Sequence, residues 1–284
     1  MPINKGAIVQ AAKLLGLKEA HHLYKLATKQ EKLESKWRRA VKEFFQDLNA
    51  KTVSDLVNRG EITHIGDEFE LFFMEHMSDV VRESANSLRD RTVIKKLARG
   101  PYSLKGLQRA WDVFRKTGKL PKDLQRPVDK LKNLYVKKCQ DVWRKEASTY
   151  VKGKDYNLEK VEQAMFDATK SPYSRAKMIV ETETTRYYNE TRREYFDRAD
   201  DITHYLFMSI RDHRTTKWCK TRHGLVYEKS EPVTDKETPP CHWNCRSEMV
   251  PLTRANPKHQ AIIKDKRRDR RTHKPEPLPK GWND

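Results

Sequence analysis

The chain has 284 residues, a length that predicts about two domains of roughly 150 residues each. Lys and Arg number 59 against 40 Asp and Glu, and the resulting net charge of +19 points to a polyanionic partner, most often nucleic acid. No run approaches the roughly 18 apolar residues of a membrane span, and residues 1–17 lack a signal-peptide cleavage site. Four cysteines are too few for a disulfide-stapled fold and indicate a reducing compartment.

Residues 20–150 are predicted to be helical. Apolar residues recur at three-, four- and seven-residue steps among charged ones, which is the pattern of helices that bury one face. Breaks are expected at Gly60 and Gly66, at Gly100-Pro101, and from Gly118 to Pro121, because Gly and Pro end helices. Cys139, alone in the last of these helices, is expected to be a core residue. The four apolar stripes lie within residues 23–48, 69–88, 104–114 and 128–143.

The chemistry of the sequence changes after a polar break at residues 152–155. Residues 158–170 predict one helix, and Ser171-Pro172 predicts the start of a second that runs to about Arg198, because Ser caps helices and Pro suits their first turn. Three short runs rich in aromatic and β-branched residues then predict a small antiparallel sheet. These runs are residues 204–210, 225–227 and 247–252.

The last 31 residues, 254–284, contain ten Lys or Arg against four Asp or Glu. Such a segment cannot bury enough apolar surface to fold alone, so we expect an extended tail, either solvated or laid along a partner. The fold class is therefore α+β: a helical domain over 1–152, an α+β domain over 153–253, and a basic extended tail over 254–284. The tail residues proposed to contact DNA are Lys264, Lys266, Arg267, Arg268, Arg270 and Arg271.

Three cysteines and two histidines fall within 27 residues of the α+β domain. Two ligand pairs at short spacing, joined by a loop, are typical of a tetrahedral zinc site, and a small sheet would gain stability from the metal. Cys219 and His223 form one pair, and Cys241 or His242 joins Cys245 in the other. Free buried thiols, or a Cys241–Cys245 disulfide that a reducing cytosol would disfavour, are the alternatives.

A catalytic interpretation of the same region is weaker. Asp212-His213 followed by His242 and Asn244 supplies some ingredients of a metal-dependent HNH nuclease, in which one His activates water and another holds a metal. No second metal-binding His follows at helical spacing, so the constellation is incomplete. Asp212 and Arg214 are instead expected to form an ion pair or backbone hydrogen bonds that hold a turn. A zinc-containing nucleic-acid module of a host cytosol is a further alternative.

Two short motifs flank the cysteine and histidine cluster. Residues 211–215 contain Asp-x-Arg-Thr directly after a predicted strand, and residues 239–246 are Pro-Pro-Cys-His-Trp-Asn-Cys-Arg. With a preceding helix that carries Thr182-Glu183 and Asn189, residues 160–252 resemble the phage Mu F-like family, the minor head or head morphogenesis proteins of tailed bacteriophages. The residues that match the structural part of this signature are Asp212, Arg214, Asn244 and Arg246.

The resemblance implies a structural virion protein and not an enzyme. It implies that Cys219, His242 and Cys245 are the ligands, with His223 or Cys241 as the fourth. Such proteins lie inside the head at the portal, after assembly in the host cytoplasm, and act in head assembly, DNA packaging or genome delivery. The expected partners are the portal protein, with the major capsid protein as a second candidate, and double-stranded DNA bound without sequence preference. The helical domain is the candidate for docking.

Overall fold

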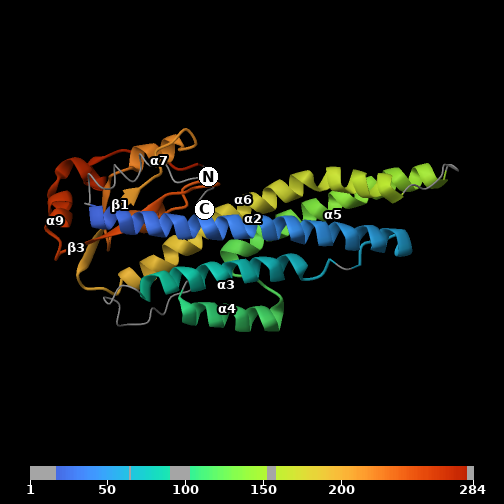
Figure 1. The fold of residues 1–284 in the computed structure, drawn as a ribbon, viewed down its shortest axis with the longest axis horizontal. Coiled ribbons are helices and arrows are strands. Elements are labelled where there is room, and N and C mark those ends of the chain that lie inside the picture. Colours follow the sequence, from blue (N-terminus) through green and yellow to red (C-terminus); the bar gives the residue numbers. More distant parts are fainter. Residues whose placement is uncertain (1–16, 64, 90–102, 152–157, 280–284) are drawn as a thin grey trace. The chain divides into compact units, whose positions relative to one another are not determined.

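The computed structural model describes residues 17–63, 65–89, 103–151 and 158–279 (Figure 1). The helical prediction for the N-terminal half is confirmed, and the break at Gly100-Pro101 lies outside the described residues. Gly60 and Gly118 follow helix ends with positive φ angles of 73° and 66°, which glycine adopts without strain. The long helices are α2 (Leu17–Arg59), α3 (Glu68–Arg89), α4 (Leu104–Thr117), α5 (Lys122–Val151) and α6 (Leu158–Phe196).

The second half carries the predicted three-stranded antiparallel sheet, in the order β2-β1-β3, so the α+β fold class is confirmed. Tyr205 in the central strand lies opposite Tyr227 on one side and Pro251 on the other. Pro251 is tolerated because its strand is at the sheet edge, where a missing backbone donor breaks no ladder. The elements are β1 (Ile202–Met208), α7 (Lys217–Arg222), β2 (Val226–Glu228), α8 (Pro232–Glu237), β3 (Glu248–Thr253), α9 (Pro257–Lys264), and the 3₁₀ turns η1 (Lys266–Arg268) and η2 (Arg270–Thr272).

The chain divides into two compact units. The helical unit consists of residues 35–76 and 109–180, and the mixed unit consists of residues 1–34, 77–108 and 181–284. The sheet lies wholly within the mixed unit. The predicted domain boundary after residue 152 falls among residues 152–157, outside the described part of the chain.

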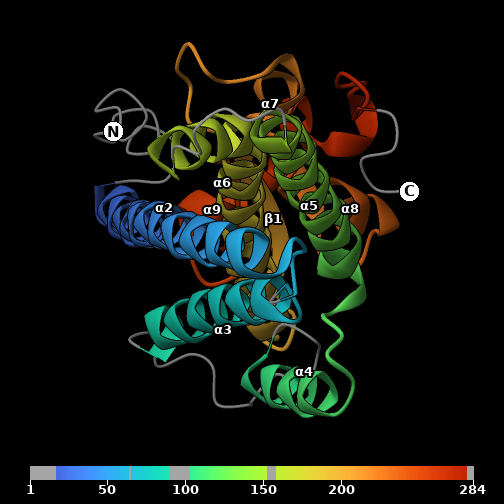
Figure 2. The same ribbon diagram turned by 90° about the vertical axis from the view of Figure 1, so that its right-hand side faces the viewer.

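Aromatic rings connect the segments of the helical unit. Phe45 of α2 makes edge-to-face contacts with Phe69 of α3, Tyr135 of α5 and Tyr173 of α6, at centroid distances of 6.1, 5.7 and 5.8 Å. Aromatic pairs of this geometry add to the stabilisation that burial provides. Cys139 is fully buried, as expected for a core residue. Figure 2 labels the helices that carry these rings.

Pro172 does not start a new helix. Helix α6 runs without interruption from Leu158 to Phe196 with Pro172 inside it, so the predicted break at Ser171-Pro172 is wrong. The buried positions continue in helical phase through the proline, at steps of three and four residues. Packing of one continuous face therefore outweighs the loss of a single backbone hydrogen bond at the proline. These buried positions are 161, 165, 169, 172, 176, 179, 183 and 187.

Both faces of the sheet are covered, because successive side chains of a strand point to opposite sides. Tyr205 and Phe207 of β1 belong to the larger apolar cluster, together with Cys219, Cys241 and Cys245. The opposite face packs beneath α9, and Figure 1 shows α9 beside β3. The apolar residues of that second cluster are Leu206, Met208, Val226, Val250, Leu252 and Ile262.

The expectation of an extended tail is wrong for residues 257–272, which form α9 and the two 3₁₀ turns. Ile262 of α9 is buried against the sheet, and Leu278 packs on the larger cluster. Side chains of Asn256, Asp265 and Asp269 accept backbone amides at the start of each turn. The basic composition hid these caps and the two apolar anchors, which dock the segment on the sheet.

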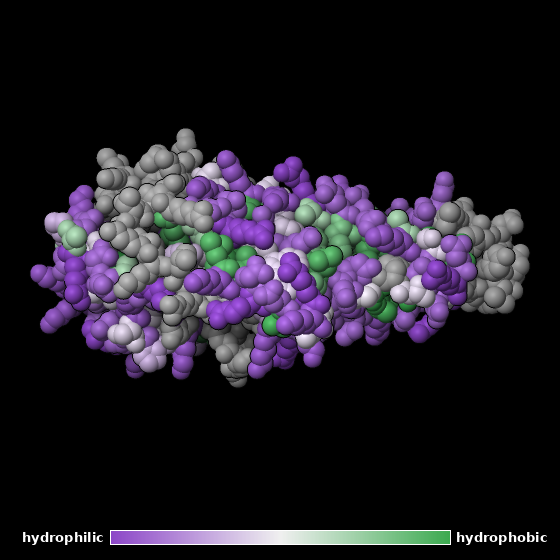
Figure 3. Space-filling model, turned by 90° about the horizontal axis from the view of Figure 1, so that it is seen from below, coloured by the Kyte–Doolittle hydropathy of each residue, from purple (hydrophilic) through white to green (hydrophobic). Residues whose placement is uncertain are grey.

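Among the coloured residues of the face drawn in Figure 3, hydrophilic ones predominate, and the hydrophobic ones lie between them in separate patches. Among the described residues, no helix combines the length and apolar character that crossing a bilayer requires.

Candidate metal centre

Cys219 of α7 meets His242 and Cys245 of the loop before β3. Their ligand atoms all lie within 4.8 Å of one another, with the Cys219 Sγ 3.2 Å from His242 Nε2 and 3.7 Å from Cys245 Sγ. A tight turn brings the loop residues together, because the Cys245 amide donates to the His242 carbonyl (3.2 Å). Asn244 completes the turn with a φ of 58°, a left-handed conformation that Asn tolerates better than most residues.

The imidazole of His242 is held by a backbone contact. Nδ1 lies 2.7 Å from the carbonyl oxygen of Trp243, which can only accept, so Nδ1 carries a proton and Nε2 faces the thiols. Burial lowers the pKa of His242, but the thiols of Cys219 and Cys245 outweigh it and raise the pKa to about 10. Burial raises the pKa of Cys245, but its thiol and imidazole neighbours more than offset this and lower the pKa below its usual value. The cluster therefore favours a thiolate at Cys245, the species that binds metals.

The other two candidate ligands, Cys241 and His223, have different surroundings. Cys241 is fully buried in the same apolar cluster as Cys219 and Cys245, but its thiol lies outside the group whose ligand atoms are all within 4.8 Å of one another. It donates weakly to the Glu237 carbonyl at 3.7 Å. The Nδ1 atom of His223 instead accepts the Ser209 amide at 3.1 Å, and burial lowers the pKa of His223 to about 4. His223 is therefore engaged elsewhere, and Cys241 is the residue next to the group of three.

Asp212 and Arg246, both part of the predicted structural motif, form a two-pronged ion pair with distances of 2.9 and 2.8 Å. The same carboxylate accepts the Arg214 amide and the Thr215 hydroxyl, each at 3.0 Å. Burial raises the pKa of Asp212, but the Arg246 guanidinium outweighs it and lowers the pKa to about 2. The ionic partner is thus Arg246, while Arg214 contributes its backbone to the turn.

A polar face of α6 supports the loop that carries the ligands. The Thr182 hydroxyl accepts the Asn244 amide (2.9 Å), and the Thr185 hydroxyl donates to the Cys245 carbonyl (2.6 Å). Both threonines are fully buried and lie on one side of the helix, three residues apart. The spacing of these polar residues was visible in the sequence, but nothing local indicated that a loop 60 residues away would satisfy them.

Asn189 continues the same face and supports a prediction. Its side-chain amide donates to the Ser247 carbonyl (3.1 Å) and accepts the Met249 amide (3.0 Å). Asn189→Ala should lower the free energy of unfolding by about 2–4 kcal/mol, because two buried backbone groups lose their partners. Urea unfolding of both proteins measures the difference. Asn58→Ala, at an exposed site of α2, is the control and should change stability by less than about 0.5 kcal/mol.

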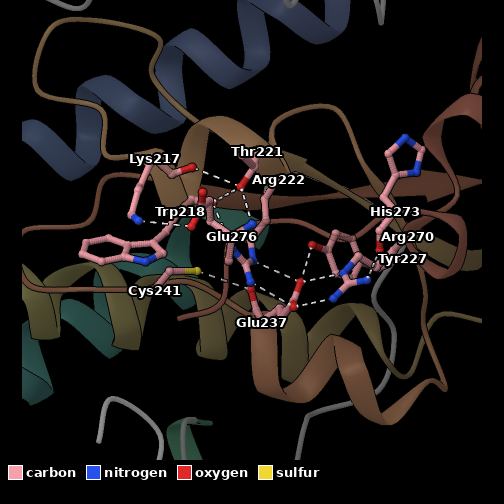
Figure 4. Close-up of polar contacts among 10 residues, drawn as sticks. All are labelled: Lys217, Trp218, Thr221, Arg222, Tyr227, Glu237, Cys241, Arg270, His273 and Glu276. Atoms are coloured by element: carbon pink, nitrogen blue, oxygen red, sulfur yellow. Dashed lines mark hydrogen bonds and ion pairs between the residues drawn. The ribbon is translucent and has the colours of Figure 1, made fainter. Parts of the chain in front are cut away.

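A second cluster is centred on Glu237 of α8, whose backbone carbonyl accepts the thiol of Cys241 (Figure 4). Arg222 and Arg270 each donate two hydrogen bonds to the Glu237 carboxylate, at 3.1 and 3.0 Å and at 2.9 and 2.8 Å. The Tyr227 hydroxyl donates a fifth at 2.7 Å. Arg222 is only 1% exposed, so this carboxylate, and not water, must stabilise its buried positive charge. The cluster ties α7, β2, α8 and η2 together, and no pattern in the sequence predicted it.

Acid should weaken this carboxylate cluster. Burial raises the pKa of Glu237, but the two arginines outweigh it and lower the pKa from 4.5 to about 2. A carboxylate whose pKa is lower in the folded state than in the unfolded state stabilises the fold at pH values above its unfolded-state pKa. This contribution is lost as the pH falls towards 2. The stability difference between wild type and Glu237→Gln should therefore shrink from about 3 kcal/mol at pH 6 to less than about half of that at pH 3. Urea titrations at both pH values test this, and a constant difference would contradict it.

The six basic residues proposed to contact DNA differ in exposure. Arg268 is half-buried and donates to the Gly224 carbonyl (3.2 Å), and half-buried Arg270 pairs with Glu237. The guanidinium groups of Arg267 and Arg271 each pair with an aspartate two positions earlier. The exposed members are Lys264, Lys266, Arg267 and Arg271.

The residues of the nuclease hypothesis do not assemble. Within the described part of the chain, the one group with metal-ligand spacing is Cys219, His242 and Cys245, and neither Asp212 nor His213 belongs to it. Asp212 is occupied by Arg246, and His213 is exposed. The arrangement therefore gives this hypothesis no support.

A family model described as "Phage Mu protein F like protein" matches residues 118–250, which begins further upstream than the resemblance predicted. The Mu-like prophage FluMu F protein of Haemophilus influenzae is 24% identical over 119 residues. That alignment covers 42% of this chain and 27% of the relative, so the chain matches about a quarter of the relative's length. No solved structure shows significant similarity to the chain.

Proposed function

Because residues 118–250 belong to the Phage Mu protein F-like family, we propose that this chain is a head morphogenesis protein of a tailed bacteriophage, carried in the virion. The family match is the observation that carries this proposal, since it spans the ligand cluster and its supporting contacts. A structural role accords with the ion pair between Asp212 and Arg246, because the polar side chains of this motif bind each other. The finer proposal is a position inside the head at the portal, with a role in assembly, packaging or genome delivery.

Mass spectrometry of purified phage particles tests the proposed function. We expect the chain to co-sediment with intact particles at a fixed ratio to the portal protein, and to co-purify with the portal when the two are expressed together. A chain found only in the soluble fraction of infected cells would contradict the proposal. Co-purification with the major capsid protein alone would contradict the portal assignment.

Contact with packaged DNA is proposed on the charge of the chain and on its exposed basic residues. We consider a variant in which Lys264, Lys266, Arg267 and Arg271 are all replaced by Gln. The slope of log affinity for DNA against log salt concentration should become shallower by about 0.9 for each phosphate that this variant no longer neutralises. Filter binding to duplexes of two unrelated sequences should give equal affinities for each protein. The charge-matched control places Gln at four exposed lysines of the helical unit, Lys116, Lys119, Lys130 and Lys137, and should leave the slope nearer to wild type.

A further inference from the structure

We propose that Cys219, Cys241, His242 and Cys245 bind one zinc ion that joins α7 to the loop before β3. The proposal stands independently of any role in a virion, because it rests on side chains within the mixed unit. It selects four of the five candidates that the sequence left open, and it assigns them a closed, structural centre.

The separations of the ligand atoms fit the metal. Tetrahedral zinc with Zn–S bonds of about 2.3 Å and Zn–N bonds of about 2.0 Å places its sulfur atoms about 3.8 Å apart and sulfur from nitrogen about 3.5 Å apart. The observed separations are 3.7 Å between Cys219 and Cys245 and 3.2 Å between Cys219 and His242. Both separations from Cys219 are therefore close to those of two ligands on one zinc ion, and the His242 and Cys245 ligand atoms lie within 4.8 Å of each other.

Contacts around the ligands already hold them in place. The Trp243 carbonyl fixes the imidazole of His242 with Nε2 towards the thiols, as carbonyl partners commonly do for metal-bound histidines. Thr185 holds the Cys245 carbonyl, and Thr182 holds the Asn244 amide. Two threonines of α6 and one carbonyl of the loop thus orient the residues that would bind the metal.

Cys241 is the fourth ligand of this proposal because it is fully buried in the apolar cluster that also holds Cys219 and Cys245. Its 3.7 Å contact with the Glu237 carbonyl is weak enough to be exchanged for a metal bond as the thiol moves towards the other three ligands. The Nδ1 atom of His223 is committed to the Ser209 amide. His223 therefore remains outside the proposed ligand set.

The space beside the cluster favours a structural centre over a catalytic one. The adjoining cavity, lined by Cys219, His242, Asn244 and Arg246 among others, holds ≈ 10 Å³, which is room for about one water molecule. A catalytic zinc keeps an open position for substrate. Four protein ligands and a cavity of this size leave no such position.

Metal titration of the full-length, reduced and metal-stripped chain tests the proposal. We expect one Co²⁺ per chain, with strong thiolate-to-cobalt absorption that Zn²⁺ abolishes by displacement. Cys241→Ser should weaken zinc binding by at least about 100-fold. His223→Asn, which keeps an acceptor for Ser209, and Cys139→Ser should bind within about threefold of wild type. Absence of stoichiometric binding by the wild type would overturn the proposal, as would unchanged binding by Cys241→Ser.

Thiol alkylation of the wild type keeps the proposal testable if a variant does not fold. With zinc bound, Cys219, Cys241 and Cys245 should react slowly, and a chelator should accelerate all three together. Cys139, buried in the helical unit, should react at the same rate with and without metal. Protection of Cys219 and Cys245 alone would refute the four-ligand set. Alkylation of the three thiols at the same rate with and without zinc would refute the centre.

Discussion

Chelation of the proposed zinc ion is expected to lower the free energy of unfolding of the mixed unit by at least about 4 kcal/mol, the linkage value for free zinc near 1,000 times its Kd. The loop that carries His242 and Cys245 has no strand or helix of its own over residues 238–247, so the proposed metal bonds would take the place of backbone pairing there. Metal binding then adds directly to folding free energy. Calorimetry of the reduced chain with and without chelator measures the loss.

The variant Cys245→Ser supplies the matched control for that experiment. It removes a proposed ligand, so the chelator should no longer change its melting temperature. The variant itself should melt near the temperature of the chelated wild type. An equal chelator effect on both proteins, or none on either, would show that no metal at this cluster stabilises the fold.

Glu237→Ala is expected to be the most damaging single substitution of a charged residue in the mixed unit, lowering stability by about 3–5 kcal/mol. It removes five hydrogen bonds and leaves the fully buried guanidinium of Arg222 without its carboxylate. Part of the tail should also loosen, because Arg270 of η2 loses its anchor. Urea unfolding gives the magnitude, and proteolysis after residue 270 reports the loosening.

Glu276→Ala is the control for Glu237→Ala. The ion pair of Glu276 with Lys217 spans 3.1 Å, but the two side chains are 40% and 65% exposed, so its loss should cost less than about 1 kcal/mol. The backbone carbonyl of Glu276, which accepts from Arg222, survives the substitution. Similar losses for the two variants would mean that the Glu237 cluster does not stabilise the unit as proposed.

The sequence predicted the helices and strands well because their signals are local. Apolar periodicity located α2 to α5, and short aromatic runs located the three strands to within about two residues. The prediction of a break at Pro172 was wrong because proline removes only one backbone hydrogen bond, whereas the buried face that holds the helix together extends over many turns. Long-range packing decided that position.

The candidate site was only partly predictable for the same reason. Spacing alone gave five equivalent ligands, and the structure separates Cys241 from His223 through a partner, Ser209, that no spacing rule would indicate. The contacts of Glu237 and Asn189 were not predictable, since their partners lie 10 to 60 residues away in the chain. A basic tail concealed Ile262, one apolar residue that docks it.

Hydrogen exchange of the backbone amides tests most directly the central claim that the loops around the ligand cluster form one structural unit braced by α6. The amides of Ser209, Asn244 and Met249 donate to side chains of His223, Thr182 and Asn189 and not to a strand partner. We predict that all three exchange with the same opening free energy as the amides of β1. Exchange of the Asn244 amide at the rate of an unprotected loop, with β1 fully protected, would contradict the claim.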